Sequence, residues 1–160
     1  MSELNVTIAR ELSRFYQEKA DAIHGWIDPL TNEHIWTRPY PYGNSIGHLL
    51  LHLTGNLNYY IGAEIAGTRY VRNRQIEFSD PTHHPKELLL KNLDAAITLV
   101  RATLEKQTDQ DWSLPYSAKG LEQAGTRFFL FLTCAAHLGH HTGQIIYLCK
   151  ELERQASLSG

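Results

Sequence analysis

Residues 45–67, SIGHLLLHLTGNLNYYIGAEIAG, carry apolar side chains at the spacing of an amphipathic helix. Ser45 is the expected N-cap, because its hydroxyl can accept a hydrogen bond from a free N–H group of the first turn. The expected end is near Gly67, since glycine commonly follows the last helical residue. The apolar positions are Ile46, Leu49, Leu50, Leu53, Leu57, Tyr60, Ile61 and Ile65.

Three further segments have the same period. They predict helices over residues 3–27, from Pro85 to the polar run QTDQD at 107–111, and from Thr126 to Arg154. No strand alternation of useful length and no internal repeat is present. Four long amphipathic helices predict an all-α four-helix bundle.

The connections between these helices differ in length and composition. Residues 28–44 and 111–125 are rich in proline, glycine and polar residues, which predicts loops. Residues 68–84, TRYVRNRQIEFSDPTHH, form a connection that is long for a bundle and rich in arginine. We expect this segment to be a long crossover connection between the second and third helices.

Composition narrows the class of protein. A chain of 160 residues with 42% hydrophobic residues predicts a single domain over residues 1–160. Its 15 Lys and Arg residues are balanced by 17 Asp and Glu residues, without a long basic run, so we expect no nucleic-acid partner.

The expected location is the cytoplasm. Cys134 and Cys149 lie on one predicted helix about four turns apart, too far for a disulfide, which indicates a reducing compartment. The first residues have charges throughout and no apolar core of a signal peptide. The longest apolar stretch, FFLFLTCAAHLG at 128–139, is too short and polar to span a bilayer, so we expect no membrane partner.

The chain holds nine histidines, and two pairs have a spacing of four residues on predicted helices. His137 and His141, in HLGHHTGQ at 137–144, are expected to lie about 40° apart on one face of the predicted helix, where both can bind one ion. His140 points about 100° away from His141 and is a poorer co-ligand. His48 and His52 form the second pair, with His52 near the middle of the apolar stripe.

Burial of several imidazoles favours a shared divalent metal ion. Each neutral ring needs a donor and an acceptor partner, and leaving them unpaired in a core costs about 1–3 kcal/mol each. The preferred ligand set is His52, His137 and His141, with solvent completing the shell as in catalytic zinc sites. His48 or Cys134 as a fourth ligand would instead give a closed, structural site. The alternative for a histidine on an apolar helix face is an ordinary core residue that binds no metal, and for His48 a ring beside the site or at the surface.

Several polar residues are candidates for a site around the metal. Asn56 and Gln144 lie one turn from ligand histidines and can orient a ring or a substrate, or make ordinary interhelical hydrogen bonds. Arg72 and Arg74 can hold an anionic substrate. Tyr59 and Tyr60 are candidates for the mouth of a pocket. Neither Glu64 nor Glu77 can be assigned as a general base. Phe128, Phe129 and Phe131 are expected core residues.

Three segments together resemble the DinB/YfiT-like superfamily over nearly the whole chain. They are NSIGHLLLHLTGNLNYYIGAEIAG, RNRQIEF and HLGHHTGQIIYLCK, and they contain an isolated histidine followed by an H-x-x-x-H-x-x-Q motif. The resemblance implies a four-helix bundle with a crossover connection and a zinc or nickel ion bound by three histidines. These positions correspond to His52, His137 and His141, the set that the helical angles also favour.

The resemblance also implies an activity and partners. The superfamily includes proteins described as metal-dependent hydrolases and transferases that use the thiols bacillithiol, mycothiol or glutathione. We therefore expect an enzyme that activates water or a low-molecular-weight thiol against a small molecule. The alternative is a non-catalytic metal-binding or stress-response module with a structural metal. A homodimer is also expected, in which Trp26, Trp36 or Tyr147 can face the partner.

Overall fold

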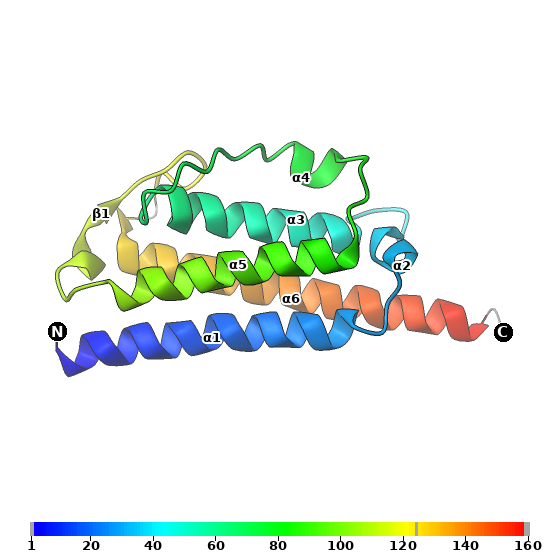
Figure 1. The fold of residues 1–160 in the computed structure, drawn as a ribbon, viewed down its shortest axis with the longest axis horizontal. Helices are drawn as coiled ribbons and strands as arrows, with labels where there is room; N and C mark the ends of the chain where they lie inside the picture. The colour runs from blue at the N-terminus through cyan, green and yellow to red at the C-terminus, as the bar shows by residue number, and fades with distance from the viewer. Residues whose placement is uncertain (1, 124, 159–160) are drawn as a thin grey trace.

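Four long helices lie side by side in the computed structural model, which describes residues 2–123 and 125–158 (Figure 1). Helix α1 packs against α5 and α6, and α3 packs against the same two helices, so α1 and α3 lie diagonally across the bundle. The predicted all-α four-helix bundle is confirmed. The helices are α1 (Glu3–Ile27), α3 (Ile46–Leu57), α5 (Lys86–Glu105) and α6 (Arg127–Leu158).

The crossover connection between α3 and α5 allows these two helices to run in the same direction. Figure 1 shows α1 and α6 running one way along the bundle, and α3 and α5 running the other way. Because α3 and α5 are parallel, residues 64–85 must return along the length of the bundle between them. This connection contains the short helix α4 (Ile76–Ser79), which packs against α3.

Helix α3 begins and continues for local reasons. The Ser45 hydroxyl accepts a hydrogen bond from the His48 N–H at 3.3 Å, as an N-cap. After Leu57 the chain continues as a π-helix, η1 (Asn58–Ala63), instead of a regular helix up to Gly67. A Cβ atom at Gly62 would lie 2.8 Å from Leu99 Cδ2, so glycine permits this wider turn to approach α5 closely.

The loops predicted over residues 28–44 and 111–125 contain short elements that the sequence did not indicate. Helix α2 is started by a capping box, in which the His34 side chain takes the place that Glu or Gln usually has. The two strands form a minimal antiparallel pair. These elements are α2 (Asn32–Trp36), the 3₁₀ turn η2 (Asp111–Ser113), β1 (Pro115–Tyr116) and β2 (Gly125–Thr126).

The hydrophobic core lies between the four long helices and includes one of the three phenylalanines expected there. Phe131 is fully buried, and its carbonyl oxygen accepts a hydrogen bond from the Tyr16 hydroxyl at 2.8 Å. Phe128 and Phe129 are 39% and 51% exposed, so placing them in the core was wrong. Both belong to the first turn of α6, where Phe129 points to nearly the opposite side of the helix from Phe131. Phe128 lies on the same side as Phe131 and contacts the Trp112 ring, but it is only partly covered there.

Other expectations about the helices can be compared with the structure. Cys134 and Cys149 are both buried and free, as their separation predicted. Trp26 and Trp36 pack against the core, whereas Tyr147 is exposed. None of the helices in the described residues is long and apolar enough to cross a membrane.

Replacement of a phenylalanine in α6 should test this core. Phe131→Ala is expected to lower the free energy of unfolding by about 3–5 kcal/mol, because it opens a cavity among fully buried side chains. The matched change Phe129→Ala, at an exposed position of the same helix, should cost about 0.5 kcal/mol or less. Urea denaturation measures both, and equal losses would contradict this packing.

Candidate metal centre

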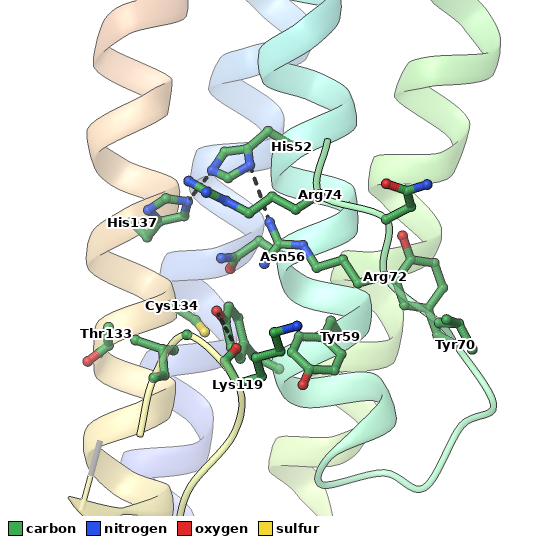
Figure 2. A pocket seen from close by; sticks show the side chains of 15 residues that line it. His52, Asn56, Tyr59, Tyr70, Arg72, Arg74, Lys119, Thr133, Cys134 and His137 are labelled. Carbon is green, nitrogen blue, oxygen red and sulfur yellow. Dashed lines mark hydrogen bonds between the residues drawn. The ribbon is translucent and has the colours of Figure 1, made fainter. Parts of the chain in front are cut away.

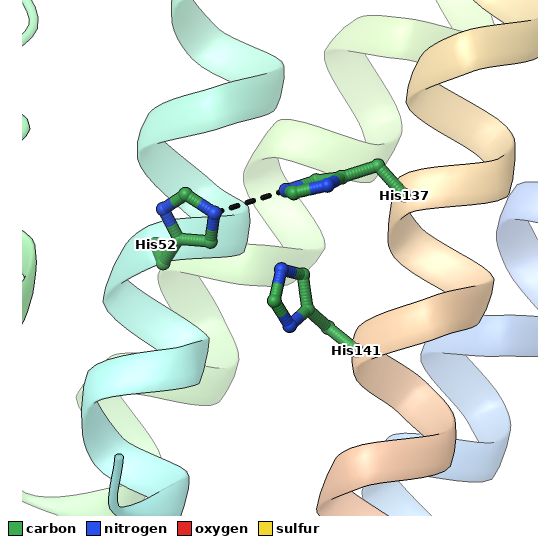
Figure 3. Close-up of side chains that lie close together, drawn as sticks. All are labelled: His52, His137 and His141. Carbon is green, nitrogen blue, oxygen red and sulfur yellow. Dashed lines mark hydrogen bonds between the residues drawn. The ribbon is translucent and has the colours of Figure 1, made fainter. Parts of the chain in front are cut away.

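Three histidines from two helices converge at the contact between α3 and α6. His52 on α3 and His137 on α6 point toward each other, with their Nε2 atoms 2.9 Å apart (Figure 2). His141 lies one turn farther along α6 and faces the same space (Figure 3). One nitrogen from each ring lies within 4.8 Å of the others. The structure therefore brings together the three residues that the sequence singled out.

Hydrogen bonds on the far side of two rings determine which nitrogen is free. His52 Nδ1 lies 2.8 Å from Glu77 Oε2, and His141 Nδ1 lies 2.6 Å from Gln144 Oε1. Each of these oxygens accepts, so each Nδ1 must carry the proton and each Nε2 keeps its lone pair. The Nε2 lone pairs of His52 and His141 are the groups that a metal ion requires. Without an ion, His52 Nε2 accepts a hydrogen bond from His137 Nε2–H at 2.9 Å, and a bound ion would take the place of that proton.

The charge state of the histidines also fits a cation. Burial, with help from the neighbouring His141 and His52 rings, lowers the pKa of His137 to about 3. Burial likewise lowers the pKa of His141, although its bond to Gln144 acts in the opposite direction. Both rings are thus neutral near pH 7. Neutral imidazole nitrogens are suitable donors for zinc, nickel and related divalent ions.

Glu77 and Arg72 form a buried ion pair behind His52. Arg72 Nε lies 2.6 Å from Glu77 Oε1, and Arg72 Nη2 lies 2.8 Å from Glu77 Oε2, which is the two-point geometry typical of arginine and carboxylate. Burial raises the pKa of Glu77, but the hydrogen bonds from Arg72 and His52 outweigh it, and the net pKa lies below the ordinary value. An ionised carboxylate therefore holds the His52 ring.

Gly55 makes room for this carboxylate. A Cβ atom built on Gly55, one turn after His52, would overlap the Glu77 carboxylate. The sequence did not assign Glu77 to the site, because a predicted crossover does not say which of its residues will lie beside His52. The available signal was the motif RNRQIEF, which places an arginine and a glutamate five residues apart in the crossover.

The other candidate ligands lie outside the cluster. His48 Nδ1 is 2.7 Å from the Ser45 hydroxyl, and its ring packs edge-on against Trp36. His140 is exposed. Burial raises the pKa of the Cys134 thiol to about 12. Among residues 2–123 and 125–158, the cluster able to hold a metal consists of the three histidines alone.

A cavity of about 1000 Å³ opens beside the histidines (Figure 2). Tyr59 and Tyr60 line it, as expected for a pocket mouth, and Arg72 and Arg74 line it as well. Asn56 also lines the cavity, but its side-chain oxygen has no hydrogen-bond partner among the described residues. The remaining lining residues are His52, Tyr70, Val71, Asn73, Lys119, Gly120, Leu121, Thr133, Cys134 and His137.

Comparison with known proteins gives a family and a fold. The family model described as "Protein of unknown function (DUF1572)" matches residues 3–159. The chain is also similar to a conserved protein from Enterococcus faecalis, known from a crystal structure, with a TM-score of 0.74 and 17% identity. That match covers 90% of this chain and 96% of the other chain, and at such identity it shows the fold alone. No curated protein matches the sequence.

Gly55→Ala should weaken metal binding by displacing the Glu77 carboxylate from His52. We expect the affinity for Zn²⁺ to fall about 10–100-fold, the usual effect of losing a group that orients a ligand. The matched control is Gly25→Ala, also within a helix, where a Cβ atom meets nothing within 4 Å. Calorimetric titration of both variants measures the difference, and equal affinities would show that Glu77 does not support the site.

Stability should fall in acid partly because of His137. Its pKa is about 3 in the folded chain and about 6.5 when unfolded, so protons favour the unfolded state. Above pH 6.5 the ring is neutral in both states and protonation costs no stability. As the pH falls from 6.5 toward 3, the unfolded chain binds a proton that the folded chain does not, so the free energy of unfolding decreases. In metal-free protein, His137→Gln should reduce the loss of stability between pH 7 and pH 5. Denaturation curves at both pH values measure this, and an unchanged loss would contradict it.

Proposed function

We propose that this chain, which belongs to the DUF1572 family of proteins of unknown function, binds one divalent metal ion and uses it in chemistry on a small molecule. The ligands are His52, His137 and His141. The single observation that carries the proposal is the approach of His52 Nε2 to within 2.9 Å of His137 Nε2 while its own Nδ1 is held by Glu77. One shared cation would engage all three rings.

The proposal includes membership of the DinB/YfiT-like superfamily. Its support is the combination of the bundle with parallel α3 and α5, the isolated His52 on α3, and the H-x-x-x-H-x-x-Q motif on α6. Zinc and nickel are the ions that we favour, because imidazole nitrogen suits both. The compartment that we propose is the cytoplasm.

The reaction that we favour is hydrolysis or transfer of a low-molecular-weight thiol. The chemistry that a divalent ion supplies at such a site is Lewis acidity, which makes water or a thiol a better nucleophile near neutral pH. Glu77 keeps the His52 ring in the tautomer that frees Nε2, and Arg72 holds Glu77. Cys134 does not serve as the nucleophile, since burial keeps its thiol protonated.

The open cavity favours an enzyme over a module with a purely structural metal. Its volume of about 1000 Å³ is within the range of small-molecule sites, and His52 and His137 contribute to its wall. A small molecule in the cavity would therefore lie against two of the three rings. A structural site would instead be closed by a fourth protein ligand.

Elemental analysis of protein purified without a nickel column should find one divalent ion per chain. His137→Ala should lose the ion, because only two of the three ligand nitrogens remain. His140→Ala, at an exposed neighbouring position outside the cluster, should retain it. Activated electrophiles should then be screened with water and several thiols as acceptors. If His137→Ala loses the metal but keeps every turnover seen with the unmodified protein, the metal has no catalytic role.

A further inference from the structure

The cavity beside the histidines has a positively charged lining. Three basic side chains contribute to it: Arg72 and Arg74 from the crossover, and Lys119 from the segment before β2. No acidic side chain of the described residues lines it. A recess with charges of one sign raises the local concentration of ligands of the opposite sign.

Two of the three positive charges are available to a ligand. Arg72 is neutralised by Glu77, behind the cavity wall. Arg74 and Lys119 take part in no ion pair with another described residue. They come from separate segments of the chain, and both side chains are drawn at the same cavity in Figure 2. Arg74 and Lys119 have weaker contacts within the chain. Arg74 lies over the Phe78 ring, 5.9 Å from its centroid. The pKa of the Glu122 carboxyl is lowered by the Gly120 N–H and, less strongly, by nearby Lys119. Neither contact is a direct ion pair, so both basic groups remain able to bind an anion at the cavity.

Asn56 provides a second and independent observation. The residue is only 7% exposed, and its Oδ1 atom is buried without any hydrogen-bond donor in the described part of the chain. Buried acceptors in folded proteins nearly always have a partner, because an unpaired one costs stability. Asn56 lies on α3 one turn from His52 and lines the cavity. A ligand N–H or O–H group is the partner that this position lacks.

We propose that the cavity binds a small organic anion that also carries a hydrogen-bond donor. Its acidic group lies against Arg74 and Lys119, and its N–H or O–H group donates to Asn56 Oδ1. The rings of Tyr59, Tyr60 and Tyr70 supply apolar surface for the body of the molecule. This inference rests on the proposed function only in naming the anion as the substrate class of the same site, since binding itself needs no metal.

The test uses small aromatic probes that separate charge from hydrogen bonding. The probes are 4-aminobenzoate and its longer homologue 3-(4-aminophenyl)propanoate, with 4-aminobenzamide lacking the charge and benzoate lacking the donor. Binding to the full chain is measured by calorimetry, without metal and with Zn²⁺. At least one of the two aminophenyl carboxylates should bind about tenfold more tightly than both 4-aminobenzamide and benzoate. If neither aminophenyl carboxylate binds more tightly than 4-aminobenzamide and benzoate, the proposal is overturned.

Variants assign the two halves of the site. The double change Arg74→Gln with Lys119→Gln should weaken binding of the preferred aminophenyl carboxylate to the level of 4-aminobenzamide. The control Arg69→Gln removes an exposed charge from the same segment outside the lining and should leave affinity unchanged. If the control weakens binding as much as the double variant does, the attraction is general and the charged subsite is excluded.

Asn56→Leu tests the acceptor. It should weaken binding of the preferred aminophenyl carboxylate to the level of benzoate and leave benzoate binding unchanged. Its unfolding midpoint should stay the same or rise, because an unpaired buried oxygen is removed. A lower midpoint with unchanged binding would show that Asn56 serves the fold and would overturn its assignment as an acceptor.

The metal and anion results can fail separately. If an aminophenyl carboxylate binds with the expected preference but the chain takes up no Zn²⁺, the inference about the cavity stands and the proposed function fails. If Zn²⁺ binds at the histidines but neither aminophenyl carboxylate is preferred, the inference fails and the metal centre stands.

Discussion

The hydrogen bond between His52 Nδ1 and Glu77 joins the crossover segment to the bundle, and the arrangement of the histidines depends on it. The bond determines which nitrogen of His52 is free. It also requires an ionised Glu77, which the buried Arg72 stabilises, and a residue without a side chain at Gly55. The same crossover supplies Arg72 and Arg74 to the cavity wall. One interaction thus connects the ligand geometry with the shape and charge of the neighbouring pocket.

The sequence predicted the four long helices because each has a continuous apolar stripe and a definite start or end. Ser45 begins α3 as expected, and α5 starts directly after Pro85. The π-helical η1 was not predictable from the stripe, since it depends on how closely Gly62 approaches Leu99 on another helix. Phe128 and Phe129 were placed in the core on residue type alone, although both are exposed in the first turn of α6.

The histidines were predictable because ligands on one helix obey helical spacing, and the bundle brings two helices together. Gln144 also contacts His141, as its spacing suggested. Spacing gave no information on Glu77, because its contact with His52 spans residues joined only by the path of the crossover. Asn56 was considered as a residue that orients a ring. The structure places Asn56 in the cavity wall and buries its side-chain oxygen without a partner in the described residues, a property that only packing reveals.

Anomalous diffraction from crystals grown with Zn²⁺ tests the central claim most directly. The account predicts one zinc peak per chain, about 2.0–2.1 Å from a nitrogen of each of His52, His137 and His141, with Glu77 still bonded to His52. A peak on other residues, or rings that point to separate surroundings with no shared ion, would contradict it.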